Sequence, residues 1–144
     1  MQARELMTGT IHCCTPTTPI QNAARLMKER DIGALPIVES EDRRKAVGIL
    51  TDRDIVIRLV AEGMNPLECA CEDAMTAQTF SVKADDSEEE VCHVMEDHQI
   101  RRVLVVNEND ICIGIISQAD IARKTSEHET AELVKDVSRP TMAA

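Results

Sequence analysis

Short apolar runs and helical stripes alternate along the first half of the chain. Ile20, Ala23, Ala24 and Met27 recur at the spacing of one helix face. Two runs follow, ALPIV at 34–38 and AVGIL at 46–50, and neither contains a charged residue. Such runs are typical of strands that are buried on both faces. The pattern predicts a helix, two strands and a second helix, DRDIVIRLVAE, at 52–62.

The second half repeats this order. Val91, Val94 and Met95 form a helical stripe, and RVLVV at 102–106 and CIGII at 112–116 predict two further strands. A last helix is predicted over 126–137, because Thr130, Leu133, Val134 and Val137 share one face. Residues 138–144, SRPTMAA, are expected to be a frayed end.

Helix ends can also be predicted from the sequence. Thr18, Pro19 and Gln21 match a capping box with proline at the first helical position, and Asp86 with Glu89 matches the same box in the second half. Gly63 is expected at the carboxyl end of the helix over 52–62, where the backbone must turn left-handed.

The two halves share sequence as well as pattern. ELMT at 5–8 matches DAMT at 73–76, which is an offset of 68 residues between Met7 and Met75. GILTDRDI at 48–55 matches GIISQADI at 114–121, and the length difference falls in the polar link between two strands. The sequence therefore predicts one repeat at 1–64, a second at 65–125, and a helix with a tail at 126–144.

The composition argues against two classes of function, nucleic-acid binding and membrane binding. The chain of 144 residues has a formal net charge of −10, and Phe80 is its only aromatic residue. An acidic surface repels nucleic-acid phosphates, and bases have no aromatic platform on which to stack, so we expect no nucleic-acid partner. No apolar run approaches the roughly 18 residues that span a bilayer. We expect a cytoplasmic protein that does not bind membranes, with an aliphatic core.

The paired motifs resemble a known family. DIGALPIV with AVGILTDRDIVIR, and HQIRRVLVV with CIGIISQADIAR, each preceded by MT, resemble the two halves of a cystathionine-β-synthase-type (CBS) domain pair, or Bateman module. The likeness is to stand-alone pairs of the hypoxic-response type. It implies an α/β (α+β) fold of tandem repeats with pseudo-twofold symmetry, in which two small sheets carry flanking helices. It also implies clefts between the repeats that bind an adenosine-containing ligand such as AMP, ADP, ATP or S-adenosylmethionine.

The repeated motif places a carboxylate one turn into each second helix. Asp54 and Asp120 are expected to be held there by free backbone N–H groups, and a fixed carboxylate can accept both hydroxyls of a ribose. Thr51 and Ser117 lie at the strand-to-helix junctions, where a hydroxyl can meet a phosphate. The resemblance implies these same roles. The alternative is that each motif only caps its own helix.

The residues before the first strand of each repeat differ in charge. Arg101 and Arg102 match positions that hold phosphate in the family, whereas Gly33 and Ala34 occupy them in the first repeat. The resemblance thus implies one site equipped for phosphate and one that is small and uncharged. The alternative is that the two arginines form surface ion pairs on an acidic protein.

The remaining chemistry is sparse. The six cysteines are Cys13, Cys14, Cys69, Cys71, Cys92 and Cys112. We expect reduced packing residues, with a disulfide as the alternative, and no metal site, because HCC and CAC lack the two-residue spacing of zinc ligands. No nucleophile–base set or glycine-rich phosphate loop occurs, so we expect no enzyme and no required cofactor.

The helix predicted over 52–62 is unusually apolar. Ile55, Val56, Ile57, Leu59 and Val60 are more apolar residues than a single surface stripe holds. We expect a homodimer built on this helix and on its counterpart ADIAR at 119–123. The resulting hypothesis is a non-catalytic sensor module that acts on a regulated protein, which the sequence does not identify. The alternative is a structural or cysteine-redox-responsive dimer with collapsed clefts.

Overall fold

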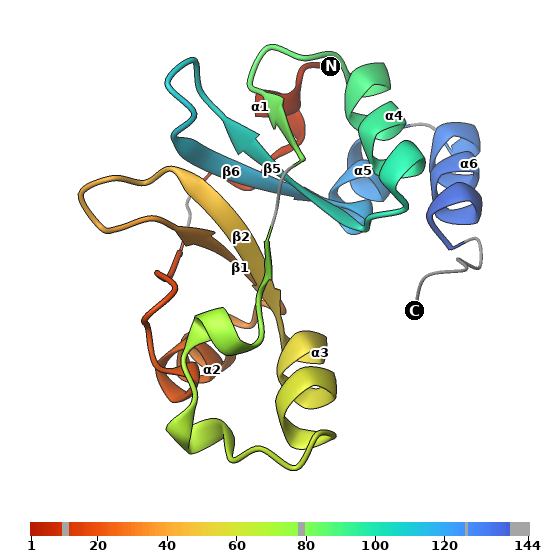
Figure 1. The fold of residues 1–144 in the computed structure, drawn as a ribbon. Helices are drawn as coiled ribbons and strands as arrows, with labels where there is room; N and C mark the ends of the chain where they lie inside the picture. The colour runs from red at the N-terminus through yellow and green to blue at the C-terminus, as the bar shows by residue number, and fades with distance from the viewer. Residues whose placement is uncertain (10–11, 78–79, 126, 139–144) are drawn as a thin grey trace. The chain divides into compact units, whose positions relative to one another are not determined.

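The computed structural model describes residues 1–9, 12–77, 80–125 and 127–138 (Figure 1). The chain forms two compact units. The first-repeat unit comprises residues 11–79 and 110–112, and the second-repeat unit comprises residues 1–10, 80–109 and 113–144. Among the described residues, no helix is both long enough and apolar enough to cross a membrane.

The first-repeat unit is a small sheet with helices. Its elements are α2 (Ile20–Arg30), β1 (Ala34–Val38), β2 (Ala46–Thr51), α3 (Asp52–Ile55), the π-helical turn η1 (Val56–Val60), the 3₁₀ turns η2 (Pro66–Glu68) and η3 (Cys71–Asp73), and β3 (Thr76–Ala77). The strands lie in the order β1-β2-β3 and are antiparallel, with Ala34 opposite Thr51 and Leu35 opposite Leu50.

The second-repeat unit is also a small three-stranded sheet with helices. Its elements are α1 (Ala3–Leu6), β4 (Ser81–Lys83), α4 (Glu88–His98), β5 (Arg102–Val106), β6 (Cys112–Ser117), α5 (Gln118–Lys124) and α6 (Glu127–Val137). The strands lie in the order β4-β5-β6, and β4 runs parallel to β5. The prediction of a mixed α/β fold with two small sheets and flanking helices is confirmed, and so are the strands predicted from the four apolar runs.

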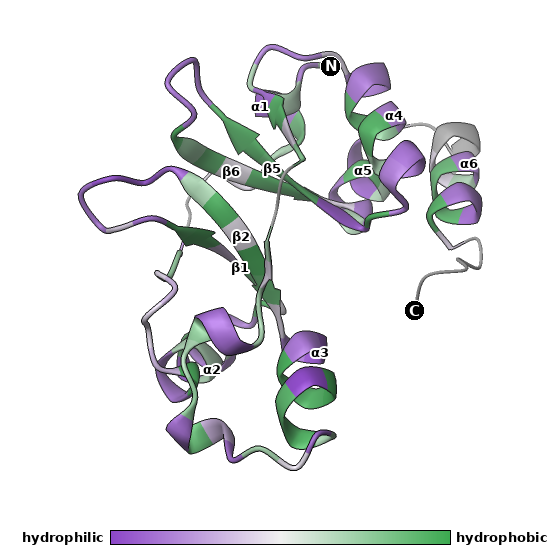
Figure 2. Cartoon of the chain, in the orientation of Figure 1, coloured by the Kyte–Doolittle hydropathy of each residue, from purple (hydrophilic) through white to green (hydrophobic). Residues whose placement is uncertain are grey.

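Both cores are aliphatic, as predicted. Apolar residues of β1 and β2 and one face of α2 form most of the first core. The second core takes buried residues from β4, β5 and β6 and from all four helices of its unit. Figure 2 shows the apolar residues concentrated in the strands, while the turn between β1 and β2 is polar. Leu133 and Val137 of α6 are buried in the second core, but Val134, which was predicted on the same face, is exposed.

The two predicted capping boxes at the first helix of each repeat are wrong. The Thr18 hydroxyl accepts the N–H of Thr15 at 3.0 Å and caps no helix, because α2 begins after Pro19. In the second repeat the cap is shifted by one residue. Ser87 accepts the N–H of Glu90 at 3.2 Å, whereas Asp86 closes the preceding turn on Lys83.

Gly63 ends its helix as predicted. Its φ is +76°, its N–H donates to the Val60 carbonyl at 3.1 Å, and the Met64 N–H donates to the Leu59 carbonyl at 2.9 Å. These two bonds form a Schellman motif, which requires a left-handed residue at this position. The helix itself changes from α to π at η1, so that the Ala61 N–H reaches the Val56 carbonyl at 2.8 Å.

The repeated Met-Thr pairs each cross a glycine, Gly114 of β6 for the first pair and Gly48 of β2 for the second. In the second-repeat unit the Thr8 N–H donates to the Ile115 carbonyl at 3.0 Å. A Cβ atom at Gly114 would lie 2.3 Å from the Met7 sulfur, so any larger residue would force this methionine to move.

The first-repeat unit has the same crossing, made by later residues. Thr76 pairs with Ile49, and a Cβ atom at Gly48 would lie 2.7 Å from the Thr76 carbonyl oxygen. Residues 1–10 thus pack with the second repeat, and the segment before residue 79 packs with the first. The compact units therefore differ from the repeats predicted at 1–64 and 65–125. Residues 1–10 pack in the second-repeat unit, and residues 65–79 pack in the first-repeat unit.

Candidate functional site

The first-repeat unit fixes Asp54 through a reciprocal capping box. The Thr51 hydroxyl accepts the Asp54 N–H at 3.1 Å, and the Asp54 carboxylate accepts the Thr51 N–H at 3.0 Å. Thr51 is extended, so the chain passes from β2 into α3 at this residue. The sequence placed Asp54 one turn into the helix, and this geometry is confirmed.

The second-repeat unit repeats the box with one more bond. The Ser117 hydroxyl accepts the Asp120 N–H at 3.2 Å, and the carboxylate oxygen Oδ2 of Asp120 accepts the Ser117 N–H at 2.8 Å and its hydroxyl at 3.0 Å. Asp120 is only 5% exposed and is the buried charged residue of the described chain. Its orientation is therefore fixed more tightly than that of Asp54.

An arginine lies against each carboxylate, and the sequence analysis missed both. Arg58 Nε lies 4.0 Å from Asp54 Oδ1 and its guanidinium donates to two backbone carbonyls of the same unit. Arg123 contacts Asp120 Oδ1 directly. Residues four or three positions apart on a helix share one face. The spacing of aspartate and arginine in DRDIVIR and DIAR therefore indicates both pairs. In each unit, one carboxylate oxygen caps the helix and the other faces an arginine.

Gly33 and Ala34 lie beside the first box. The Gly33 carbonyl accepts the N–H of Asp52 at 3.0 Å, and Ala34 lies opposite Thr51 in the sheet. A Cβ atom at Gly33 would lie 3.2 Å from the Asp52 carboxylate. The expectation of an uncharged surrounding is therefore wrong, because Asp52, which the sequence analysis did not consider, brings a negative charge against Gly33.

Arg101 and Arg102 occupy the same place in the second-repeat unit. The Arg101 carbonyl accepts the N–H of Gln118 at 3.0 Å, which ties the start of β5 to the start of α5. Within the described part of the chain, neither arginine side chain has a hydrogen bond or an ion pair. The surface ion pairs weighed as an alternative are thus not formed among these residues.

Gln118 adds a donor without an acceptor. Its side-chain nitrogen Nε2 is buried and has no hydrogen-bond partner among the described residues. A buried unsatisfied donor costs free energy comparable to a lost hydrogen bond, and such groups mark places where a ligand or water completes the bonding. The set around Asp120 therefore combines a fixed carboxylate, two unpaired cations and one unpaired amide.

Metal ligands do not gather in the described residues. No group of three or more histidine, cysteine, aspartate or glutamate side chains is placed there to hold an ion. A tetrahedral zinc site needs four nitrogen or sulfur ligands, or three with an open position.

Two units, each with a three-stranded sheet and a capped carboxylate at a strand-to-helix junction, define a tandem-repeat α/β module. The family model described as CBS domain matches residues 3–61 and 71–127. The chain therefore belongs to the CBS domain family, and the family predicted from the repeated motifs is confirmed.

One relative matches along nearly the whole chain. Hypoxic response protein 1 of Mycobacterium tuberculosis is 39% identical over 142 residues, covering 99% of this chain and 97% of the relative. A crystal structure of Hypoxic Response Protein I with two coordinated zinc ions is similar at a TM-score of 0.76 and 38% identity, covering 88% of this chain and all of the other.

A second solved structure carries ligands. The CBS domain pair of protein MJ0100, in complex with 5′-methylthioadenosine and S-adenosyl-L-methionine, matches at a TM-score of 0.74 and 26% identity. The match covers 85% of this chain and 98% of that domain pair. Both ligands of this neighbour contain adenosine.

Proposed function

We propose that this protein is a non-catalytic, cytoplasmic regulatory module that binds an adenosine-containing ligand. The observation that carries the proposal is the set of unpaired donors beside Asp120. Arg101, Arg102 and the Gln118 amide lack partners in the described structure, and the nearby carboxylate is fixed by Ser117. These groups match a ligand that has both anionic oxygens and a diol.

In this proposal Asp120 binds the ribose, and Arg101 and Arg102 bind phosphate. The carboxylate keeps lone pairs beyond those used by Ser117 and Arg123, and a ribose hydroxyl donates to such an oxygen. Guanidinium groups bind phosphate through charge-assisted hydrogen bonds, which are shorter and stronger than neutral ones. AMP, ADP and ATP satisfy both requirements.

The first-repeat unit offers a different site. Asp54 and Thr51 repeat the ribose geometry, but Gly33 and Ala34 supply no cation and Asp52 adds a negative charge. Phosphate is repelled here, so an adenosine compound without phosphate fits better. The neighbour's 5′-methylthioadenosine and S-adenosylmethionine are ligands of this kind, and S-adenosylmethionine is cationic at sulfur.

Calorimetry and thermal unfolding with AMP, ATP, 5′-methylthioadenosine and S-adenosylmethionine test the proposal. A ligand at about 100 times its dissociation constant stabilises the folded state by roughly 2.7 kcal/mol. Asp120→Asn keeps a side chain of the same size that can still cap, and it should weaken nucleotide binding. Asp42→Asn, in the exposed turn after β1, is the matched control and should bind like the wild type.

The proposal fails if no adenosine compound stabilises or binds the folded protein. It also fails at this site if a nucleotide binds and Asp120→Asn and Asp54→Asn both retain the wild-type affinity. The competing function, a structural or redox-responsive dimer without a ligand, would then be favoured.

We also propose that the protein is a homodimer. Val56, Ile57 and Val60 of η1 are 57%, 42% and 54% exposed, and Met64 and Leu67 continue the same exposed apolar stretch of chain. A second copy of this chain supplies a matching apolar surface, as expected of the CBS family. Light scattering should give a dimer mass for the wild type and a monomer mass for Ile57→Glu. A monomeric wild type at micromolar concentration contradicts this assembly.

A further inference from the structure

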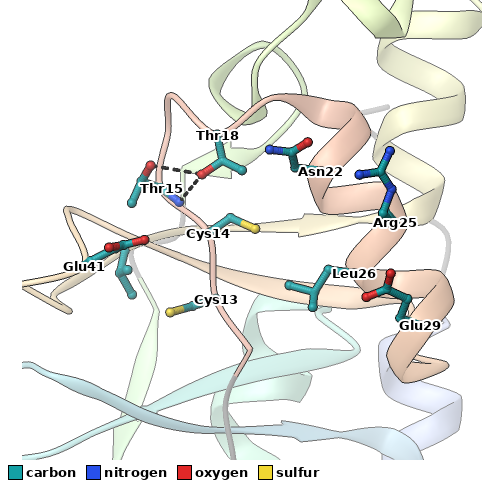
Figure 3. Close-up of a pocket in the computed structure, with 10 residues that line it drawn as sticks. Cys13, Cys14, Thr15, Thr18, Asn22, Arg25, Leu26, Glu29 and Glu41 are labelled. Atoms are coloured by element: carbon teal, nitrogen blue, oxygen red, sulfur yellow. Dashed lines mark hydrogen bonds between the residues drawn. The ribbon is translucent and has the colours of Figure 1, made fainter.

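A cavity separate from the candidate site lies in the first-repeat unit. Its volume is about 360 Å³, and it lies between α2 and the segment that precedes α2 (Figure 3). Small-molecule sites in proteins measure roughly 300–1,000 Å³, so this cavity suits a ligand smaller than a nucleotide. None of the predicted site residues lines it.

The floor of this cavity is apolar and is formed by Cys14, Leu26 and Val38. Cys14 is 7% exposed and Val38 is 1% exposed, and Leu26 of α2 packs against the aliphatic core of the unit. Backbone hydrogen bonds hold the floor in place. The Cys14 N–H donates to the Pro36 carbonyl at 3.1 Å, and the Val38 N–H donates to the Cys14 carbonyl at 2.9 Å. An apolar side chain can therefore bury its surface on a preformed floor.

The rim of the cavity is charged and polar. Asn22, Arg25 and Glu29 line it from α2, and Glu41 lines it from the turn after β1. Figure 3 shows Glu41 on the opposite side of the Cys14 segment from the other three side chains. All four residues are exposed, and within the described chain their side chains make no hydrogen bond or ion pair. The rim thus offers one cation, two anions and one amide to a ligand.

Arg25 and Glu29 lie one turn apart on one face of α2. Residues at this spacing have Cβ atoms about 5–6 Å apart, which allows an ion pair, but a basic residue before an acidic one is the less favourable order. This pair is not formed among the described residues. Two unpaired opposite charges at this spacing match a ligand that carries a carboxylate and an ammonium group on one carbon atom.

We propose that this cavity binds a free amino acid with an apolar side chain. Its carboxylate binds the Arg25 guanidinium through paired N–H donors, with the Asn22 amide as a further donor, and its ammonium group binds Glu29. Its side chain lies on the apolar floor. The Glu41 carboxylate repels anions, which disfavours an acidic side chain. This site is independent of adenosine binding, because none of its residues belongs to either capping box.

Leucine is the probe for this site. During a leucine titration followed by NMR, the amide signals of residues 13–18 and of α2 should shift, and calorimetry measures the dissociation constant. Leucinamide lacks the carboxylate, N-acetylleucine lacks the ammonium charge, and glycine lacks the apolar side chain. Each should bind about tenfold more weakly than leucine, or weaker still. Glutamate should also bind more weakly, and Glu41→Gln should reduce this difference.

Two variants assign the charges to the ligand's groups. Arg25→Gln should weaken leucine about tenfold or more, because charge-assisted hydrogen bonds are lost, and should leave the affinity for leucinamide unchanged. Glu29→Gln should weaken leucine to a similar extent and leave the affinity for N-acetylleucine unchanged. Lys28→Gln, an exposed residue of the same helix that does not line the cavity, is the matched control and should bind leucine like the wild type.

The wild-type titration requires no variant to fold, so it keeps the test decisive. The proposal is overturned if leucine at millimolar concentration shifts no signal of residues 13–18 or α2, or if leucinamide and N-acetylleucine bind as tightly as leucine. It is overturned as well if Arg25→Gln and Glu29→Gln both keep the wild-type affinity for leucine. Both substitutions replace exposed side chains without partners in the described structure, so thermal unfolding of these variants should match the wild type.

Discussion

The starts of α3 and α5 have the same internal geometry and different surroundings. Each has a hydroxyl and a carboxylate that cap one another, and each carboxylate faces an arginine of its own helix. Beside α5 the chain places Arg101 and Arg102, whereas beside α3 it places Gly33 and the carboxylate of Asp52. The motif thus fixes an acceptor in both units. The charge of each site is set by the residues at the start of the first strand and, in the first-repeat unit, also by Asp52 at the start of α3.

The crossings of the two Met-Thr pairs differ in a similar way. At Gly48 the nearest atom that excludes a side chain is a backbone oxygen of β3, whereas at Gly114 it is the Met7 sulfur, with Cγ and Cβ of the same side chain at 2.9 and 3.0 Å. A backbone atom cannot move without the strand, but a methionine can adopt another rotamer. The same glycine is therefore required more strictly in the first-repeat unit.

The largest expected effect comes from these glycines. Gly48→Ala should lower the free energy of unfolding by about 3 kcal/mol, because overpacking displaces β3. Gly114→Ala should cost about 1–2 kcal/mol, and Met7→Ala in the same chain should recover part of this loss. Urea unfolding measures both. Equal losses in the two single variants, without recovery in the double variant, would contradict the comparison.

The next effect concerns the cations. Arg101→Ala or Arg102→Ala should weaken AMP or ATP about tenfold or more, since a charge-assisted hydrogen bond contributes roughly 1.5–3 kcal/mol. The affinity for 5′-methylthioadenosine should not change. Arg30→Ala, at the exposed end of α2, is the control. Calorimetry that finds wild-type ATP affinity in both arginine variants would show that phosphate binds elsewhere.

A smaller effect should distinguish the two hydroxyls. Thr51→Ala and Ser117→Ala each remove a cap, which costs about 1 kcal/mol. We expect the larger loss for Ser117→Ala, because Asp120 is buried and also accepts the Ser117 hydroxyl. Thermal unfolding of the two variants, with Thr17→Ala as an exposed control, measures the difference. The idea of a more tightly held Asp120 is wrong if the order is reversed.

The smallest effect sharpens the charge comparison. Asp52→Gln gives α3 the residue that begins α5, and it removes the carboxylate against Gly33. We expect affinity for a phosphate-bearing ligand to rise a few-fold, by about 0.5 kcal/mol, since exposed charges are screened by solvent. Calorimetry with AMP in low salt is the measurement. An unchanged or lower affinity would show that Asp52 does not exclude phosphate.

The elements of the fold were largely predictable, because periodicity and repetition are local properties of the sequence. The four apolar runs became strands, and Gly63 ended its helix. The capping of α2 was not predictable in this way, because Thr18 had two local partners and bonded the backbone of Thr15 instead. Choices between such competing short-range bonds depend on where the preceding chain is anchored.

The candidate site was predicted in its motif and missed in its surroundings. Thr51 with Asp54 and Ser117 with Asp120 lie within one helical turn, so their spacing determines their contact. Asp52 reaches Gly33 only because β1 and β2 pair in one register, and the unpaired state of the Gln118 amide is a property of packing.

The packing of residues 1–10 in the second-repeat unit has a consequence for folding during translation. Residues 1–10 leave the ribosome before all of their packing partners, since Ala3 and Leu6 share a core with Val103 and Ile121. At about 5–20 residues per second, α1 waits roughly 5–20 s for α5 to emerge. Most of the first-repeat unit is complete by residue 79 and can fold within that time. We therefore expect vectorial synthesis to assemble the first-repeat unit before the second, with Ala3 and Leu6 still unburied in the interval.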